Sequence, residues 1–124
     1  MLKLVLYGVP VTKKNSGQIW INQKTNKPFI APSKAYKAYE KDCGKQITGD
    51  KKQHIDVPIN LKCVYYMPNR RKVDLCNLLG ATCDILVKFG VIADDNSKIV
   101  QSHDGSRVLT DKANPRVEIE IEEE

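Results

Sequence analysis

The stretch RRKVDLCNLLGATCDIL, residues 70–86, decides the fold of this chain. It opens on a basic run that ends at Asp74, a residue type that caps helix N-termini, and apolar residues then recur every three or four positions. The pattern continues to Gly90, a residue type that favours the position just past a helix C-terminus. We therefore predict a helix from about Asp74 to Gly90 with one apolar face toward the core. That face consists of Leu75, Leu78, Thr82, Ile85, Leu86 and Phe89.

The segments on either side of this helix alternate in the way that strands do. Apolar side chains recur at every second position within residues 2–6, 56–68 and 116–124, which predicts three strands. Residues 18–22 and 27–31 flank a polar turn and predict a β-hairpin. Ser33 is a candidate cap for a helix over residues 34–47, and one further strand follows an acidic turn at 94–95. The order predicts a single α/β or α+β domain in which a mixed or antiparallel sheet packs against two main helices.

Charge and cysteine usage narrow the class of protein. The 124 residues carry a formal net charge of +5, although five Glu are concentrated in residues 118–124, so the rest of the chain is more basic still. A basic surface favours nucleic acid as the partner, while a merely solvated basic surface is the alternative. The four cysteines form no CxxC pair and no zinc-finger spacing, and no apolar run reaches transmembrane length. We expect an intracellular protein with reduced, mostly buried thiols and no membrane partner.

Carboxylates gather at the two ends of the predicted helix. Asp74 lies at its start, and Asp94 and Asp95 lie in the turn that follows it. If the helix packs on a sheet that both flanking strands join, these groups become neighbours beside the basic run. Hard cations such as Mg²⁺ use one or two protein carboxylates together with substrate phosphate, so the cluster suits metal-assisted phosphodiester hydrolysis. The alternative treats Asp74 as a cap, the acidic pair as turn residues and the basic run as solvated surface, and spacing alone leaves both interpretations open.

A family pattern matches the same region. Residues 67–100 resemble the RusA family of Holliday junction resolvases, whose pattern is a basic run, Asp-Leu-Asp-Asn-Leu, a lysine, a helix containing an Asp, a Gly, and an Asp-Asp turn before a strand. The positions that match without a gap are Asp74, Leu75, Asn77, Leu78, Ala81, Asp84, Leu86, Gly90, Asp94 and Asp95. The remainder of the chain agrees more loosely, through an opening strand, a basic loop containing Asn15 and a helix that begins after a serine.

The resemblance implies one RusA-like endonuclease domain over residues 1–124 and a homodimer that nicks branched DNA, the four-way junction, symmetrically. It further implies Mg²⁺, with Mn²⁺ as a substitute, a role in DNA recombination, repair or phage DNA processing, and a bacterial cytoplasmic location, often with a phage or prophage gene. By position, Asp74 and Asp95 would be catalytic, and Asp74, Asp94 and Asp95 would hold the metal. The implied DNA-binding residues are Lys13, Lys14, Asn15, Arg70, Arg71 and Lys72.

Two functional positions depart from the family pattern. Cys76 stands where the second Asp is expected, and Gly80 stands where the lysine is expected. A thiolate is a soft ligand that Mg²⁺ does not favour, and glycine offers no charge. On a helical wheel Cys76, Gly80, Cys83 and Val87 form a small, uncharged stripe, which we expect to lie away from Asn77, Asp84 and Lys88. Three hypotheses remain open: the stripe permits close packing, the enzyme keeps reduced activity through its remaining carboxylates, or the protein binds junctions without cutting them. A protein-interaction module is a further alternative.

Overall fold

The computed structural model describes residues 1–13, 18–21, 23–31 and 33–124. The chain runs through β1 (Leu2–Tyr7), β2 (Gln18–Ile21), β3 (Pro28–Ala31), α1 (Lys34–Gln46), the 3₁₀ helix η2 (Gly49–Lys51), β4 (Ile59–Met67), α2 (Leu75–Lys88), β5 (Val100–Ser102), β6 (Arg107–Thr110) and β7 (Arg116–Glu123). Among these described residues, no helix is both long and apolar enough to cross a membrane.

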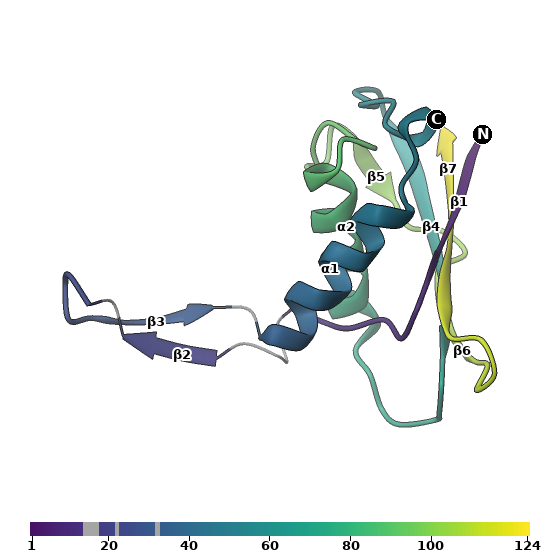
Figure 1. Cartoon of the computed structure of the whole chain (residues 1–124). Coiled ribbons are helices and arrows are strands. Elements are labelled where there is room, and N and C mark those ends of the chain that lie inside the picture. Colours follow the sequence, from purple (N-terminus) through teal and green to yellow (C-terminus); the bar gives the residue numbers. More distant parts are fainter. Residues whose placement is uncertain (14–17, 22, 32) are drawn as a thin grey trace.

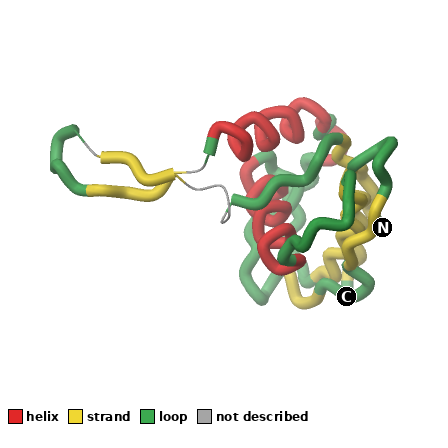
Figure 2. Tube along the Cα trace, turned by 90° about the horizontal axis from the view of Figure 1, so that it is seen from below, coloured by secondary structure: helices red, strands yellow, loops and turns green. Residues whose placement is uncertain are grey.

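The main sheet is mixed, as the sequence predicts. Its strand order is β1-β7-β4-β5, and β6 also pairs with β4. Strand β7 runs antiparallel to both β1 and β4, whereas β5 and β6 run parallel to β4. Both helices cover the same face of this sheet, and the β2–β3 hairpin extends away from the two layers (Figure 1, Figure 2). The fold is therefore a two-layer α+β domain with a projecting hairpin.

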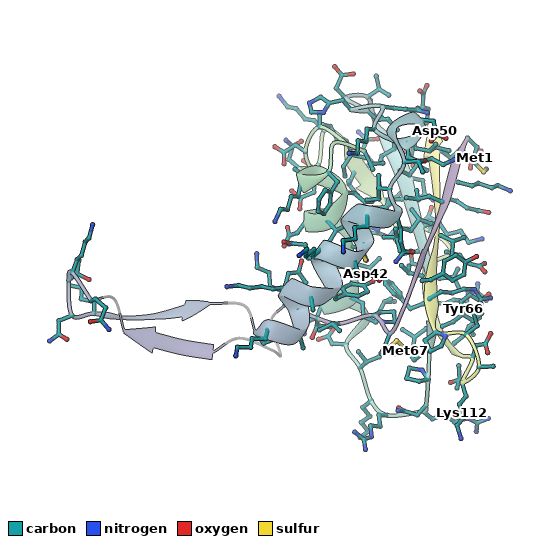
Figure 3. The ribbon with its side chains drawn as sticks, viewed as in Figure 1. Met1, Asp42, Asp50, Tyr66, Met67 and Lys112 are labelled. Atoms are coloured by element: carbon teal, nitrogen blue, oxygen red, sulfur yellow. The ribbon has the colours of Figure 1, made fainter. Side chains whose placement is uncertain are left out.

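The predicted alternation places one side of each long strand in the core. In the register of β4 with β7, Leu61 lies opposite Ile121 and Cys63 opposite Ile119, and all four side chains are buried. The intervening residues face away from the helices. Tyr66 belongs to this outer face (Figure 3), where the guanidinium of Arg116 lies 3.8 Å from the centre of its ring. Because the helices cover only one side, the other face of the sheet carries mainly polar and charged side chains.

Helix α2 lies between the two residues that the sequence predicts for its ends, Asp74 and Gly90. The N–H groups of Cys76 and Asn77 donate to Oδ1 of Asp74 at 2.9 and 3.4 Å, so Asp74 is the N-cap. At the other end Gly90 has φ +79°, and the N–H of Val91 donates to the carbonyl of Leu86 at 2.9 Å. This left-handed residue and its 6→1 bond form a Schellman motif, which satisfies carbonyls at the helix end.

Helix α1 also begins where predicted, because the N–H of Tyr36 donates to Oγ of Ser33 at 3.2 Å. The segment before β7 differs from the prediction. The sequence pattern predicts one strand between the acidic turn and the last strand, whereas the structure has both β5 and β6. All four residues of β6 are exposed, so this strand lacks the alternation that would reveal it.

Candidate active site

A cleft of about 310 Å³ lies beside the N-terminal half of α2. Three parts of the chain contribute to it: the segment after β1, the exposed face of α2 and the turn that follows α2. The lining residues are Lys13, Cys76, Asn77, Gly80, Ala81, Asp84 and Asp95. The structure therefore brings Asp95 of the acidic turn next to α2, although Asp74, which the sequence also predicts beside this turn, does not line the cleft.

Helix geometry explains which side chains of α2 face the cleft. Cys76, Gly80 and Asp84 are spaced four residues apart, so they lie above one another on one face of the helix. Leu78, Ile85 and Leu86 occupy the opposite side and are at most 1% exposed. Cys76 and Gly80 are exposed and Asp84 is partly exposed, which leaves this face available to a ligand.

Two carboxylates and one ammonium group meet in this cleft. Nζ of Lys13 lies 3.7 Å from Oδ2 of Asp84, and both side chains are about half exposed, at 50% and 45%. Burial, together with the negative charges of Asp95 and Asp84, raises the pKa of the neighbouring Cys83 thiol to about 12. Asp84 and Asp95 both line this cleft, one from α2 and the other from the turn that follows it. The cleft thus combines negative charge that can hold a cation with a lysine that can hold an anion.

Asp74 and Asp94 do not join this cleft, and their side chains accept hydrogen bonds from neighbouring residues of the chain. Asp74 caps α2. Oδ1 of Asp94 accepts the N–H of Asp95 at 2.7 Å, and its Oδ2 accepts Nδ2 of Asn96 at 3.1 Å. Neither residue lines the cleft. Within the described parts of the chain, no three His, Cys, Asp or Glu side chains are grouped so that they could hold a metal ion by themselves.

The cleft nevertheless contains donors of the right chemistry for a hard cation. Asp84 and Asp95 supply carboxylate oxygens, and Asn77 carries an amide oxygen. Mg²⁺ is usually held by one or two protein carboxylates, and water and substrate phosphate complete its coordination shell. Two carboxylates are therefore enough protein ligands for this ion. The Cys76 thiol adds a soft donor that Mg²⁺ does not favour.

Asp84 is the residue that the sequence analysis did not assign to the site, although it matches the family pattern. The spacing along the sequence could have identified Asp84. It lies one helical turn beyond Gly80 and two turns beyond Cys76, so it shares their face of the helix. The expected small stripe is accordingly wrong in one respect: Asp84 and Asn77 line the same cleft as Cys76 and Gly80 instead of lying away from them. Cys83, a further member of that stripe, is buried.

The open space at Gly80 bears on the packing hypothesis. A Cβ built at Gly80 would meet no atom of the described residues within 4 Å, beyond its chain neighbours and its own helix backbone. Within the described part of this chain, nothing therefore packs closely on Gly80. A methyl group at this position would therefore fit without a clash.

The predicted DNA-binding residues divide into three sets. Lys13 lines the cleft. Arg70, Arg71 and Lys72 are exposed on the loop that leads from β4 to Asp74, outside the cleft lining. Lys14 and Asn15 lie outside the described residues. The basic run therefore flanks the N-terminus of α2 at one end of the cleft.

A mixed sheet with two helices on one face and a carboxylate-lined cleft agrees with the domain that the resemblance implies. The model of the endodeoxyribonuclease RusA family matches residues 8–122. The crossover junction endodeoxyribonuclease RusA of Aquifex aeolicus (strain VF5) is 34% identical over 99 residues, which cover 77% of this chain and 72% of that protein. The chain belongs to the RusA family.

Proposed function

We propose that this protein binds four-way DNA junctions and cleaves their phosphodiester bonds in a reaction that depends on a divalent metal ion. The observation that carries the proposal is the cleft in which Asp84, Asp95 and Lys13 meet, within a RusA-family domain. Since a four-way junction has two equivalent strands to cut, a homodimer would present one such cleft to each strand.

The three charged side chains of the cleft and the basic run beside it each have a role in this proposal. Asp84 and Asp95 would hold the ion, with Mg²⁺ preferred and Mn²⁺ as a substitute. When bound, the ion would lower the pKa of an attacking water and stabilise the leaving oxygen. Lys13 would hold a phosphate oxygen of the scissile group through its ammonium group. The exposed run Arg70, Arg71 and Lys72 would bind the neighbouring backbone, which orients the DNA without reading its sequence.

A second candidate function is junction binding without cleavage. It is supported by the two altered positions on the cleft face of α2, where Cys76 is a poor Mg²⁺ ligand and Gly80 leaves open space. The two functions share a DNA-binding surface and differ only in chemistry. They can therefore be separated by measuring binding and nicking on the same substrate.

The first test is nicking of a synthetic four-way junction by the parent protein in Mg²⁺ or Mn²⁺. We expect paired nicks, and we expect Asp95→Asn or Asp84→Asn to reduce the nicking rate by about 10²-fold or more, because the charge stabilisation by a catalytic metal is worth several kcal/mol. Junction affinity should change little. Asp56→Asn, an exposed carboxylate outside the cleft, is the matched control and should nick like the parent.

Binding without nicking in any metal would contradict cleavage and favour the second function. Absence of binding at low salt would contradict both functions and favour a protein-interaction module. The double variant Cys76→Asp with Gly80→Lys then tests whether the parent is an impaired catalyst. A large gain in nicking rate would identify these two positions as the cause, whereas equal rates would mean that the remaining groups suffice.

A further inference from the structure

Four lysines form a single stripe along α1, on the side opposite its buried residues. We call this set, Lys34, Lys37, Lys41 and Lys45, the lysine row. Their spacing of three, four and four residues places them within about 80° of one another around the helix, at 100° per residue. All four are exposed, whereas Tyr36, Tyr39 and Cys43 on the other side are at most 8% exposed.

Within the described residues, the lysine row forms no ion pair. Of the two carboxylates on α1, Glu40 accepts from Nζ of Lys88 at 2.5 Å, and Asp42 accepts from Nε2 of Gln46 at 3.0 Å. In the part of the chain that the structure describes, no carboxylate lies within 4.0 Å of a lysine of the row. Some lysines outside the row are paired, since Lys3 and Lys62 both lie within 4.0 Å of Glu120. The row is thus a concentration of positive charge that no carboxylate of the described residues pairs with directly.

A groove beside the lysine row begins one helical turn of α2 from the candidate active site. About 640 Å³ in volume, it lies between α1 and α2 and is lined by Lys37, Glu40, Lys41, Gly44, Lys45, Lys88 and Phe89. Lys88 is one helical turn beyond Asp84, so the cleft and the groove share one continuous side of α2. A ligand that leaves the cleft along α2 would therefore reach the row.

The length of the row suits the backbone of a DNA duplex. Its first and last members are eleven positions apart, which is about 16 Å at 1.5 Å per residue. Along its axis a duplex carries one phosphate per strand for every 3.4 Å, so the row covers the axial length of about five base pairs. We propose that the lysine row binds the phosphate backbone of a duplex arm of the DNA substrate as that arm leaves the cleft. This inference rests on the proposed DNA-binding function.

The test is the triple variant Lys37→Gln with Lys41→Gln and Lys45→Gln, assayed for junction binding over a series of salt concentrations. Each lost phosphate contact should reduce the slope of log affinity against log salt by about 0.9, so we expect a decrease of roughly 2 to 3. Affinity at low salt should fall at least about tenfold. Glutamine and lysine have similar helix propensities, so α1 should remain intact, which circular dichroism can check.

Two matched variants make the result specific. The variant Lys3→Gln with Lys52→Gln and Lys62→Gln changes the net charge equally, with exposed or partly exposed lysines outside the row and the groove, and should keep the parent slope. Arginine at the three row positions should retain the binding. If the parent binds junctions and the glutamine triple variant shows the same affinity and slope, the row does not bind DNA. If the parent itself does not bind, the proposed function fails before the row is tested.

Discussion

Asp74 has two possible roles that a pair of substitutions can separate. Its Oδ1 accepts two N–H groups at the start of α2, and the resemblance to the family pattern implies that the same carboxylate would bind a metal ion. Asp74→Ala should lower the free energy of unfolding by about 1 kcal/mol through loss of the cap. Asp74→Asn retains a capping oxygen and removes the charge, so it should keep the stability and lose nicking if the carboxylate contributes to metal binding. Urea unfolding and junction nicking measure the two effects.

Ser33→Ala is the control for this pair. Ser33 caps α1 in the same way, so its loss should destabilise by a similar amount without changing the nicking rate of folded protein. Parent-like nicking by Asp74→Asn would assign Asp74 to capping alone. In that case Asp84 and Asp95 would remain as the carboxylates of the proposed centre.

The candidate site could be predicted from sequence only as far as local spacing determines it. Asp95 and Lys13 were expected in a functional surface, and both line the cleft. Asp95 lines the cleft, whereas Asp94 forms hydrogen bonds within its own turn. This difference depends on the backbone conformation after α2, which sequence spacing does not specify. The ion pair of Lys13 with Asp84 joins residues 71 positions apart, so it depends on how the segment after β1 packs on α2.

At the level of elements, the approach of α1 to α2 depends on the absence of a side chain at Gly44. A Cβ built at this position would overlap the ring of Phe89 at the C-terminus of α2. Gly44→Ala should gain about 1 kcal/mol of helix propensity but cost about 1 to 3 kcal/mol in strain. Because a rigid ring and a backbone must move apart, we expect net destabilisation, measured as a lower urea midpoint.

The substitution Gly80→Ala is the same chemical change, but we expect it to stabilise the protein. The space around Gly80 is open to 4 Å and the residue is inside α2, so alanine should stabilise the protein by up to about 1 kcal/mol. Equal effects of the two substitutions would contradict the packing argument. Phe89→Leu combined with Gly44→Ala should recover part of the loss if the ring is the obstacle.

Several of the elements that were predicted correctly have burial that alternates or repeats. Strands β4 and β7 bury every second residue, and α2 buries one stripe, so their sequences carry the signal. Strand β6 is exposed throughout and is held by its parallel pairing with β4, from Val64 opposite Arg107 to Met67 opposite Thr110. Backbone pairing of this kind leaves no hydrophobic pattern, which is why β6 was missed.

At the scale of the whole molecule, three of the four cysteines lie in one shared hydrophobic core, so their reactivity can be used to follow its unfolding. Cys43 of α1, Cys63 of β4 and Cys83 of α2 are at most 5% exposed, whereas Cys76 is exposed in the cleft. Burial raises the pKa of Cys43 to about 11 and that of Cys63 and Cys83 to about 12, so these thiols stay protonated at pH 8. Since the thiolate is the reactive form, a maleimide should modify Cys76 alone in the folded protein.

The cooperativity of the fold can be tested in the variant Cys76→Ser, which leaves the three buried thiols. They come from three elements of one hydrophobic cluster, so each should become reactive only when the whole domain unfolds. Their modification rates in the native protein should agree, after correction for intrinsic reactivity, and should rise together with urea along the global unfolding curve. Mass spectrometry of modified peptides resolves the three sites. Faster modification of Cys43, with a weaker dependence on urea, would instead mean that α1 detaches before the sheet and α2 unfold.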